Sequence, residues 1–133
     1  MARDVKDVLR AHGISPTAQR VAVAEYLLDT DEHPSADQVW DRVKGRIPVI
    51  SRATVYNTLN LFVDKGLVRS YTLTEGAQVF DPKTEPHHHF IDEATGRIHD
   101  VPWDALRVEG LEGLRDLDVA HYQVGLRGRA GER

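Results

Sequence analysis

The stretch Ser51-Arg-Ala-Thr-Val-Tyr-Asn-Thr-Leu-Asn-Leu-Phe-Val-Asp-Lys-Gly66 predicts a helix with a defined start, a defined end and two different faces. Ser51 suits the N-cap, and Gly66 suits the left-handed residue that ends a helix. One face is an apolar stripe at helical spacing, formed by Val55, Leu59, Phe62 and Val63. The other face carries side chains that can contact phosphates and base edges, namely Arg52, Tyr56, Asn57 and Asn60. The pattern favours a nucleic-acid recognition helix over an ordinary amphipathic surface helix.

Shorter helices are expected upstream of this segment, over residues 3–12, over 18–30 and after Ser35. Pro16 suits the first position of the second helix, where its missing N–H is not needed. Downstream, residues 67–73 and 77–80 alternate like strands and are joined across Thr74-Glu75-Gly76, which predicts a β-hairpin. Helices followed by a hairpin predict a winged helix-turn-helix over residues 1–81.

The second half of the chain is expected to form a separate small domain. Residues 82–86 contain two prolines and are interpreted as a hinge. Over residues 87–133 we expect strands at 87–92 and 97–101, a helix from Pro102 to about Leu114, and a last strand at 119–126. The fold class is therefore α+β, with an N-terminal winged helix and a C-terminal α/β domain. So small a domain exposes much apolar surface alone, which favours dimerisation through it.

Composition and charge narrow the range of functions. The chain has 133 residues, is 41% hydrophobic and carries a net charge of −4. Residues 1–82 hold 10 basic and 11 acidic side chains, so any DNA contact is a local patch rather than a global field. The absence of cysteine excludes disulfides and thiolate zinc sites, and fits the cytoplasm. No apolar run approaches the roughly 18 residues of a membrane span, and no signal peptide is recognised.

Three consecutive histidines, His87-His88-His89, suggest a metal site. In a strand, His87 and His89 share one face while His88 points away. Asp81 and Asp100 are the acidic candidates that flank them. Imidazole with carboxylate suits Fe(II), Mn(II), Co(II) or Zn(II) without strong selectivity. A solvated strand with chance histidines is the alternative. No Ser/His/Asp set, Gly-rich phosphate loop or placed general base is visible, so we expect no enzyme.

The motifs at 51–59, Pro16-Thr-Ala-Gln-Arg20, His87-His-His-Phe90 and Gly96-Arg-Ile-His-Asp-Val101 resemble the ferric uptake regulator (Fur) family. The resemblance extends from about residue 3 to Gly128. It implies a homodimeric, metal-sensing transcriptional regulator with an N-terminal winged helix and a C-terminal dimerisation domain. It also implies a regulatory metal site that uses residues from both domains, at His33, Asp81, His87, His89 and Asp100. The implied contacts to double-stranded DNA are Arg20, Ser51, Arg52, Thr54, Tyr56 and Asn57.

The chain departs from the family pattern in its metal sites. Asp92 and Thr95 stand where a first Cys-x-x-Cys pair belongs, and no second pair follows, so no four-cysteine structural zinc is expected. The positions of an additional family site hold Pro86, His88, Arg107 and Tyr122, which leaves His88 with His121 as a weaker second metal site. Asn57, Asp81 and Asp100 are more similar to the peroxide-responsive (PerR) and iron-response (Irr) branches.

These observations lead to one main hypothesis and two alternatives. The main one is a metal-dependent dimeric repressor of iron or peroxide-stress genes that binds an AT-rich inverted repeat with Fe(II) or Mn(II), for which Zn(II) substitutes in vitro. A peroxide-sensing version would oxidise a ligand histidine, His33 or His87. An Irr-like alternative binds DNA without metal gating and responds to haem or another signal. The third is a metal-binding protein or metalloenzyme whose winged helix contacts proteins.

Overall fold

The computed structural model describes residues 4–72 and 78–131, which form two compact units, Met1–Thr84 and Glu85–Arg133. The division falls inside the segment predicted as a hinge. That the second unit is a dimerisation domain remains a prediction. The mixed helix and strand content confirms the predicted α+β class. Each unit is described separately below.

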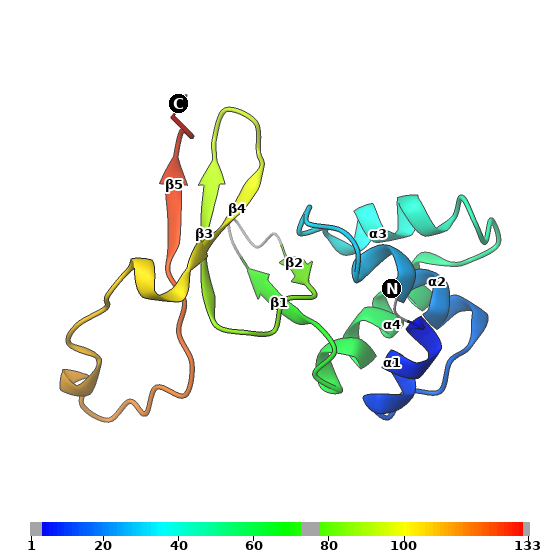
Figure 1. Ribbon diagram of the computed structural model, residues 1–133, viewed down its shortest axis with the longest axis horizontal. Coiled ribbons are helices and arrows are strands. Elements are labelled where there is room, and N and C mark those ends of the chain that lie inside the picture. Colours follow the sequence, from blue (N-terminus) through cyan, green and yellow to red (C-terminus); the bar gives the residue numbers. More distant parts are fainter. Residues whose placement is uncertain (1–3, 73–77, 132–133) are drawn as a thin grey trace. The chain divides into compact units, whose positions relative to one another are not determined.

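The first unit has helices followed by an antiparallel hairpin, which is the arrangement of a winged helix (Figure 1). In chain order its elements are α1 (Val5–Ala11), α2 (Ala18–Leu27), α3 (Ala36–Val43), α4 (Arg52–Asp64), β1 (Arg69–Thr72) and β2 (Gln78–Asp81). Its antiparallel strands pair Arg69 with Asp81 and Thr72 with Gln78. The predicted strands at 67–73 and 77–80 are therefore present, with shifted ends. Its expected turn, Thr74-Glu75-Gly76, lies outside the described residues.

The core of this unit is built from the apolar faces of α1, α2, α3 and α4, together with strand β2. The side chains buried most completely include Leu9, Val23, Leu27, Val39, Val55, Leu59, Phe62 and Phe80. Full burial of one such side chain contributes about 1.5–3 kcal/mol. The unit therefore has a core of its own.

The helix starts follow from side-chain caps. Ser35 accepts a hydrogen bond from the Gln38 N–H at 3.2 Å, and the Gln38 side chain accepts one from the Ser35 N–H, which completes a capping box. The prediction that Pro16 occupies the first helical position of α2 is wrong. Thr17 is the N-cap because its hydroxyl can accept the Arg20 N–H, at 3.2 Å, and Pro16 precedes it. Helix α2 also ends at Leu27 rather than at residue 30.

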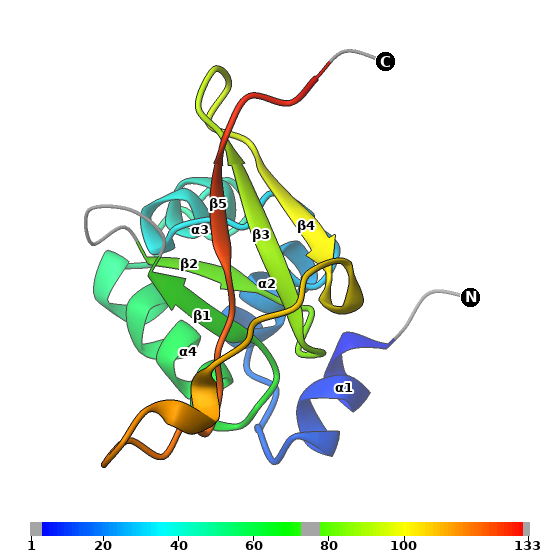
Figure 2. The same ribbon diagram turned by 90° about the vertical axis from the view of Figure 1, so that its left-hand side faces the viewer.

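The second unit is a three-stranded sheet with β3 in the middle (Figure 2). Its strands are β3 (His87–Asp92), β4 (Ile98–Pro102) and β5 (Gly125–Gly128). Strand β4 pairs antiparallel with β3, and His89 lies opposite Asp100. Strand β5 runs parallel to β3, and His89 lies opposite Gly125. The prediction of β3 is confirmed in full, and that of β4 to within one residue.

The expected helix from Pro102 to Leu114 is wrong. This segment holds only two short 3-10 turns, η1 (Trp103–Ala105) and η2 (Leu111–Gly113). Leu106 is extended and Gly110 has a φ of 91°, so the backbone leaves helical geometry twice. No residue from 103 to 114 is buried, so a helix here would lack the packed face on which most helical stability depends.

The last strand is also shorter than expected, because it begins at Gly125 instead of residue 119. Among the described residues of the second unit, no apolar side chain is buried. Its exposed large apolar side chains are Trp103, Leu114, Leu117, Val119, Tyr122 and Leu126. A sheet with so little core of its own needs further apolar surface to cover it.

No helix within 4–72 or 78–131 has the length and apolar character needed to cross a bilayer.

Candidate DNA-contact helix and metal centre

Helix α4 has the two faces that the sequence predicts. The Ser51 hydroxyl caps it by accepting the Thr54 N–H at 3.0 Å, and Gly66 follows its end with a φ of 75°. Val55, Leu59 and Phe62 are fully buried in the core, together with most of Thr58, whereas Val63 is only partly covered. The caps and the buried face therefore fix the position of α4 in the first unit.

The exposed face of α4 presents three of the predicted DNA contacts, Arg52, Tyr56 and Asn57. Tyr56 is 37% exposed, so its ring and hydroxyl are accessible to a binding partner. Two further predicted contacts, Ser51 and Thr54, hydrogen-bond to each other through their hydroxyls at 2.8 Å. Those two side chains therefore have a structural role at the helix start.

Arg20 lies at the start of α2, where its guanidinium donates to the Ser15 carbonyl at 2.9 Å. It lines a shallow groove of about 230 Å³ between α2 and α4. Thr54 and Asn57 line the same groove, so three predicted contacts from two helices face one surface of the first unit. Their assignment to DNA remains a proposal.

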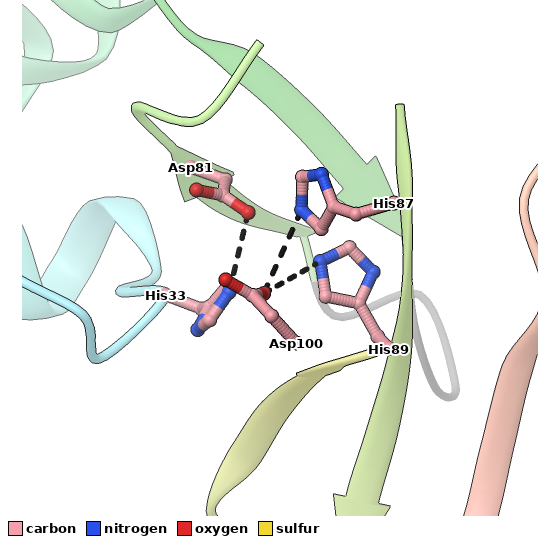
Figure 3. A group of neighbouring side chains, drawn as sticks. All are labelled: His33, Asp81, His87, His89 and Asp100. Atoms are coloured by element: carbon pink, nitrogen blue, oxygen red, sulfur yellow. Dashed lines mark ion pairs between the residues drawn. The ribbon is translucent and has the colours of Figure 1, made fainter. Parts of the chain in front are cut away.

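In the first unit, His33 and Asp81 form a buried pair, with His33 Nε2 3.2 Å from Asp81 Oδ2 (Figure 3). The Phe80 N–H donates to the Pro34 carbonyl at 2.9 Å, which ties the loop before α3 to the end of β2. His33 has a φ of 53°, a conformation that non-glycine residues rarely adopt. Such strain is often found at functional sites, where the surrounding structure enforces it.

In the second unit, His87 and His89 share one face of β3, as alternation predicts (Figure 3). Their Nε2 atoms lie 3.6 Å and 3.7 Å from the same carboxylate oxygen, Oδ1 of Asp100 on β4. Ligands on one metal ion with bonds of about 2.1 Å are separated by roughly 3.0–3.4 Å. Small side-chain movements would therefore let these three groups bind one cation.

The hydrogen bonds at Nδ1 decide which histidines can act as ligands. His87 Nδ1 lies 2.6 Å from the Glu85 carbonyl, and His89 Nδ1 lies 2.9 Å from Oε1 of Gln123. Both partners accept, so Nδ1 carries the proton and the Nε2 lone pair remains for a metal. Gln123 is not predictable from the sequence as a partner of His89, because no spacing pattern connects two residues 34 positions apart.

His88 has the opposite arrangement. Its Nδ1 accepts the Val124 N–H at 2.9 Å, so the proton of a neutral ring lies on Nε2. Nε2 is buried without a hydrogen-bond partner among the described residues, and the ring stacks on Trp103 at a centroid distance of 4.6 Å. His121 is exposed. These contacts give no support to a second metal at His88 and His121, which remains a prediction.

Asp92 and Thr95 close the turn between β3 and β4. Asp92 Oδ1 accepts the Ala94 N–H at 2.9 Å, and the Thr95 hydroxyl accepts the Arg97 N–H at 3.1 Å. The Ala94 N–H lowers the pKa of the Asp92 carboxyl, because the hydrogen bond favours the charged form. At the position where the family pattern has cysteines, this chain therefore has a turn held by hydrogen bonds.

The candidate ligands together are three imidazoles and two carboxylates: His33, Asp81, His87, His89 and Asp100. Such a nitrogen and oxygen set without sulfur fits Fe(II), Mn(II) or Zn(II). Two histidines and one carboxylate on the second unit match the triad that holds non-haem Fe(II) with open coordination positions. The chemistry of the residues therefore fits a divalent transition metal.

A winged helix followed by a sheet with candidate histidine and carboxylate ligands fits the class of metal-dependent winged-helix regulators. The model of the ferric uptake regulator family matches residues 11–126. The peroxide-responsive repressor PerR of Staphylococcus epidermidis is 37% identical over 122 residues, covering 90% of this chain and 81% of that protein. The chain belongs to the ferric uptake regulator family.

Two solved structures are similar over nearly the whole chain. The Campylobacter jejuni peroxide stress regulator matches with a TM-score of 0.68 and 27% identity, covering 98% of this chain and 99% of that one. The ferric uptake regulator from Pseudomonas aeruginosa with manganese matches with a TM-score of 0.72 and 23% identity, covering 98% and 100%. The chain is thus a metal-responsive transcriptional regulator, which confirms the expectation that it is not an enzyme.

Proposed function

We propose that one divalent cation binds His33 and Asp81 of the first unit together with His87, His89 and Asp100 of the second, and so switches DNA binding on. The observation that carries this proposal is the incompleteness of each ligand set. The first unit offers two side chains, and the second a triad that leaves coordination positions open. A cation shared by both sets gains ligands that neither unit supplies alone.

Sharing a cation would fix the angle between the two units, which are joined through the hinge at 82–86. In a homodimer, this angle sets the distance between the two copies of α4. Half-sites one helical turn apart require that distance to be correct, which is why metal binding would control DNA binding. The exposed apolar side chains of the second unit support a homodimer, because a second copy would cover them.

The proposed operator is an AT-rich inverted repeat in double-stranded DNA, read by Tyr56 and Asn57 on α4 with Arg20 nearby. The symmetry of the repeat follows from the two-fold symmetry of a homodimer. A repressor of this kind acts where the DNA is, and we assign it to the cytoplasm.

The proposed native metal is Fe(II) or Mn(II), with Zn(II) as a substitute in vitro. Five protein ligands leave one position of an octahedral ion open to a small molecule. The printed names of the Staphylococcus epidermidis and Campylobacter jejuni relatives support peroxide as the signal. Fe(II) bound here would supply the reduction of hydrogen peroxide, with His33 or His87 as the side chain that gains an oxygen atom.

The test is anaerobic fluorescence anisotropy of the metal-free protein on a labelled AT-rich inverted-repeat duplex, titrated with Mn(II). Manganese retains the ligand preferences of iron without its rapid oxidation. We expect binding to appear only as Mn(II) is added, and to be absent for His87→Ala at the same Mn(II) concentration. Tight binding by the metal-free protein would overturn metal gating and favour the Irr-like alternative, in which histidines respond to another signal.

A further inference from the structure

Arg52, the first residue of α4, is held by an acidic residue of another helix. Its Nε donates to Asp37 Oδ1 at 2.8 Å, and one terminal nitrogen donates to Oδ2 at 2.7 Å. This is a bidentate guanidinium–carboxylate pair, the strongest geometry for such a contact. About half of each side chain remains exposed. A side chain predicted to contact DNA therefore already has a well-oriented partner on α3.

Several local features keep this pair charged and in place. Asp37 lies in the first turn of α3, where the helix dipole favours a negative charge. The hydrogen bond and charge of Asp37 raise the pKa of the Arg52 guanidinium, with a smaller contribution from a hydrogen bond to Tyr56. Because Arg52 contacts both residues, the pair also borders the tyrosine that we assign to DNA.

The pairing matters because the first unit has no surplus of positive charge. Other basic side chains of this unit are likewise paired with acidic ones, in the pairs Arg10–Asp7, Arg42–Glu32, Lys44–Asp41 and Arg46–Glu25. Together with Arg52–Asp37 these make five pairs, and Arg52 is the basic residue among them that lies on α4. Binding to DNA of any sequence depends mainly on basic side chains that neutralise phosphates. A carboxylate paired with a cation on the DNA-contact helix reduces what that cation contributes to phosphate binding.

We propose that Asp37 is a specificity-determining residue, which holds Arg52 back from the phosphates of DNA that lacks the operator. This inference rests on the proposed DNA-binding function. On random DNA, affinity comes mainly from phosphate contacts, and pairing with Asp37 reduces the share that Arg52 contributes. On the operator, contacts from α4 to base edges hold the helix where Arg52 remains paired with Asp37, so affinity there depends less on a phosphate contact from Arg52. Asp37 therefore lowers affinity for random DNA more than affinity for the operator, which is a form of discrimination by repulsion.

The chain offers a matched control. Asp41 lies one turn further along α3 and is exposed. It pairs at 3.3 Å with Lys44, the residue that caps the end of the same helix. Asp37→Asn and Asp41→Asn change the net charge equally, but only the first removes the partner of Arg52. Thermal melts followed by circular dichroism check that both variants fold. Asp37→Ser serves if Asp37→Asn does not, because serine is well tolerated near a helix start.

The experiment uses the full chain with Mn(II) and two 30-base-pair duplexes. One is selected by the wild-type protein from a random pool, and the other is GC-rich without an inverted repeat. For Asp37→Asn we expect affinity for the GC-rich duplex to rise about five- to tenfold at 0.1 M salt. The slope of log K against log salt should steepen by about 1.8, or about 0.9 for the added phosphate contact of each protomer in the homodimer. Affinity for the selected duplex should change less than threefold. Asp41→Asn should stay within twofold of the wild type on both.

The same substitution in an Arg52→Ala background separates a role through Arg52 from a general charge effect. There, Asp37→Asn should leave affinity and salt slope unchanged. Equal effects of Asp37→Asn and Asp41→Asn, or an effect that persists without Arg52, would overturn this inference while the proposed function stands. A wild-type protein that selects no sequence and binds neither duplex would overturn the proposed function, and this inference with it.

Discussion

The hydrogen bond from His89 to Gln123 gives the sharpest prediction about the metal centre. His89 is fully buried, and its Nδ1 lies 2.9 Å from the Gln123 side-chain oxygen. We expect Gln123→Leu to lower Mn(II) affinity, because leucine fills a similar volume but cannot accept the proton. Without an acceptor at Nδ1, the neutral ring gains by moving its proton to Nε2, which faces Asp100 Oδ1 at 3.7 Å. A ring in that tautomer has no lone pair at Nε2 for the metal.

The size of the effect follows from the cost of the lost bond. A buried donor left without a partner costs about 1–3 kcal/mol, and loss of an outer hydrogen-bond partner typically lowers metal affinity 10- to 100-fold. The two ranges agree, since 10- to 100-fold corresponds to about 1.4–2.7 kcal/mol. We therefore expect the Mn(II) dissociation constant of Gln123→Leu to rise 10- to 100-fold at pH 7.5.

The assay is competition for Mn(II) between the protein and a chromophoric chelator, under anaerobic conditions. Gln123→Glu is the matched control, because its carboxylate keeps the acceptor, and its affinity should equal or exceed that of the wild type. Thermal melts of the metal-free proteins report whether both variants fold. A folded Gln123→Leu protein with Mn(II) affinity within twofold of the wild type would refute this role of the hydrogen bond.

Three further predictions concern α4 and the β3–β4 turn. Ser51→Ala removes the N-cap of α4 and should lower the free energy of unfolding by about 1 kcal/mol in urea titrations, and an unchanged midpoint would show that the cap contributes nothing. Tyr56→Ala should weaken DNA binding at least tenfold with an unchanged sedimentation coefficient, and unaltered affinity would remove Tyr56 from the DNA contacts. Because the pKa of Asp92 is lower in the folded than in the unfolded protein, its ionised carboxylate stabilises the fold above the unfolded pKa of about 3.9. This stabilisation is lost as the pH falls through the folded pKa. The difference in unfolding free energy between the wild type and Asp92→Asn should therefore shrink below about pH 4. A difference that stays constant from pH 7 to pH 3 would contradict the last of these.

The features that local sequence determines were predictable. Helix α4 is bounded by Ser51 and Gly66, and both act through hydrogen bonds or backbone angles within one turn. The shared face of His87 and His89 follows from strand alternation, which needs no knowledge of the rest of the chain. These parts of the fold and of the candidate site depend on neighbours in sequence.

The features that were missed depend on partners distant in sequence. Residues 103–114 contain apolar side chains at spacings compatible with a helix, but no described part of the chain buries them, and Gly110 turns the backbone away. The Gln123 contact spans 34 positions and the Asp37 contact spans 15. A single sequence carries no signal for such pairs, because either side chain alone reads as an ordinary surface residue.

The central claim is that one cation takes ligands from both units, and the number of histidine nitrogens bound to Mn(II) tests it most directly. Pulsed electron paramagnetic resonance of the Mn(II) protein counts these nitrogens. We predict three in the wild type, from His33, His87 and His89, and two in His33→Ala, which should also lose its Mn(II)-dependent DNA binding. A count of two in both proteins, with DNA binding unaffected by His33→Ala, would contradict a shared cation and confine the metal to the second unit.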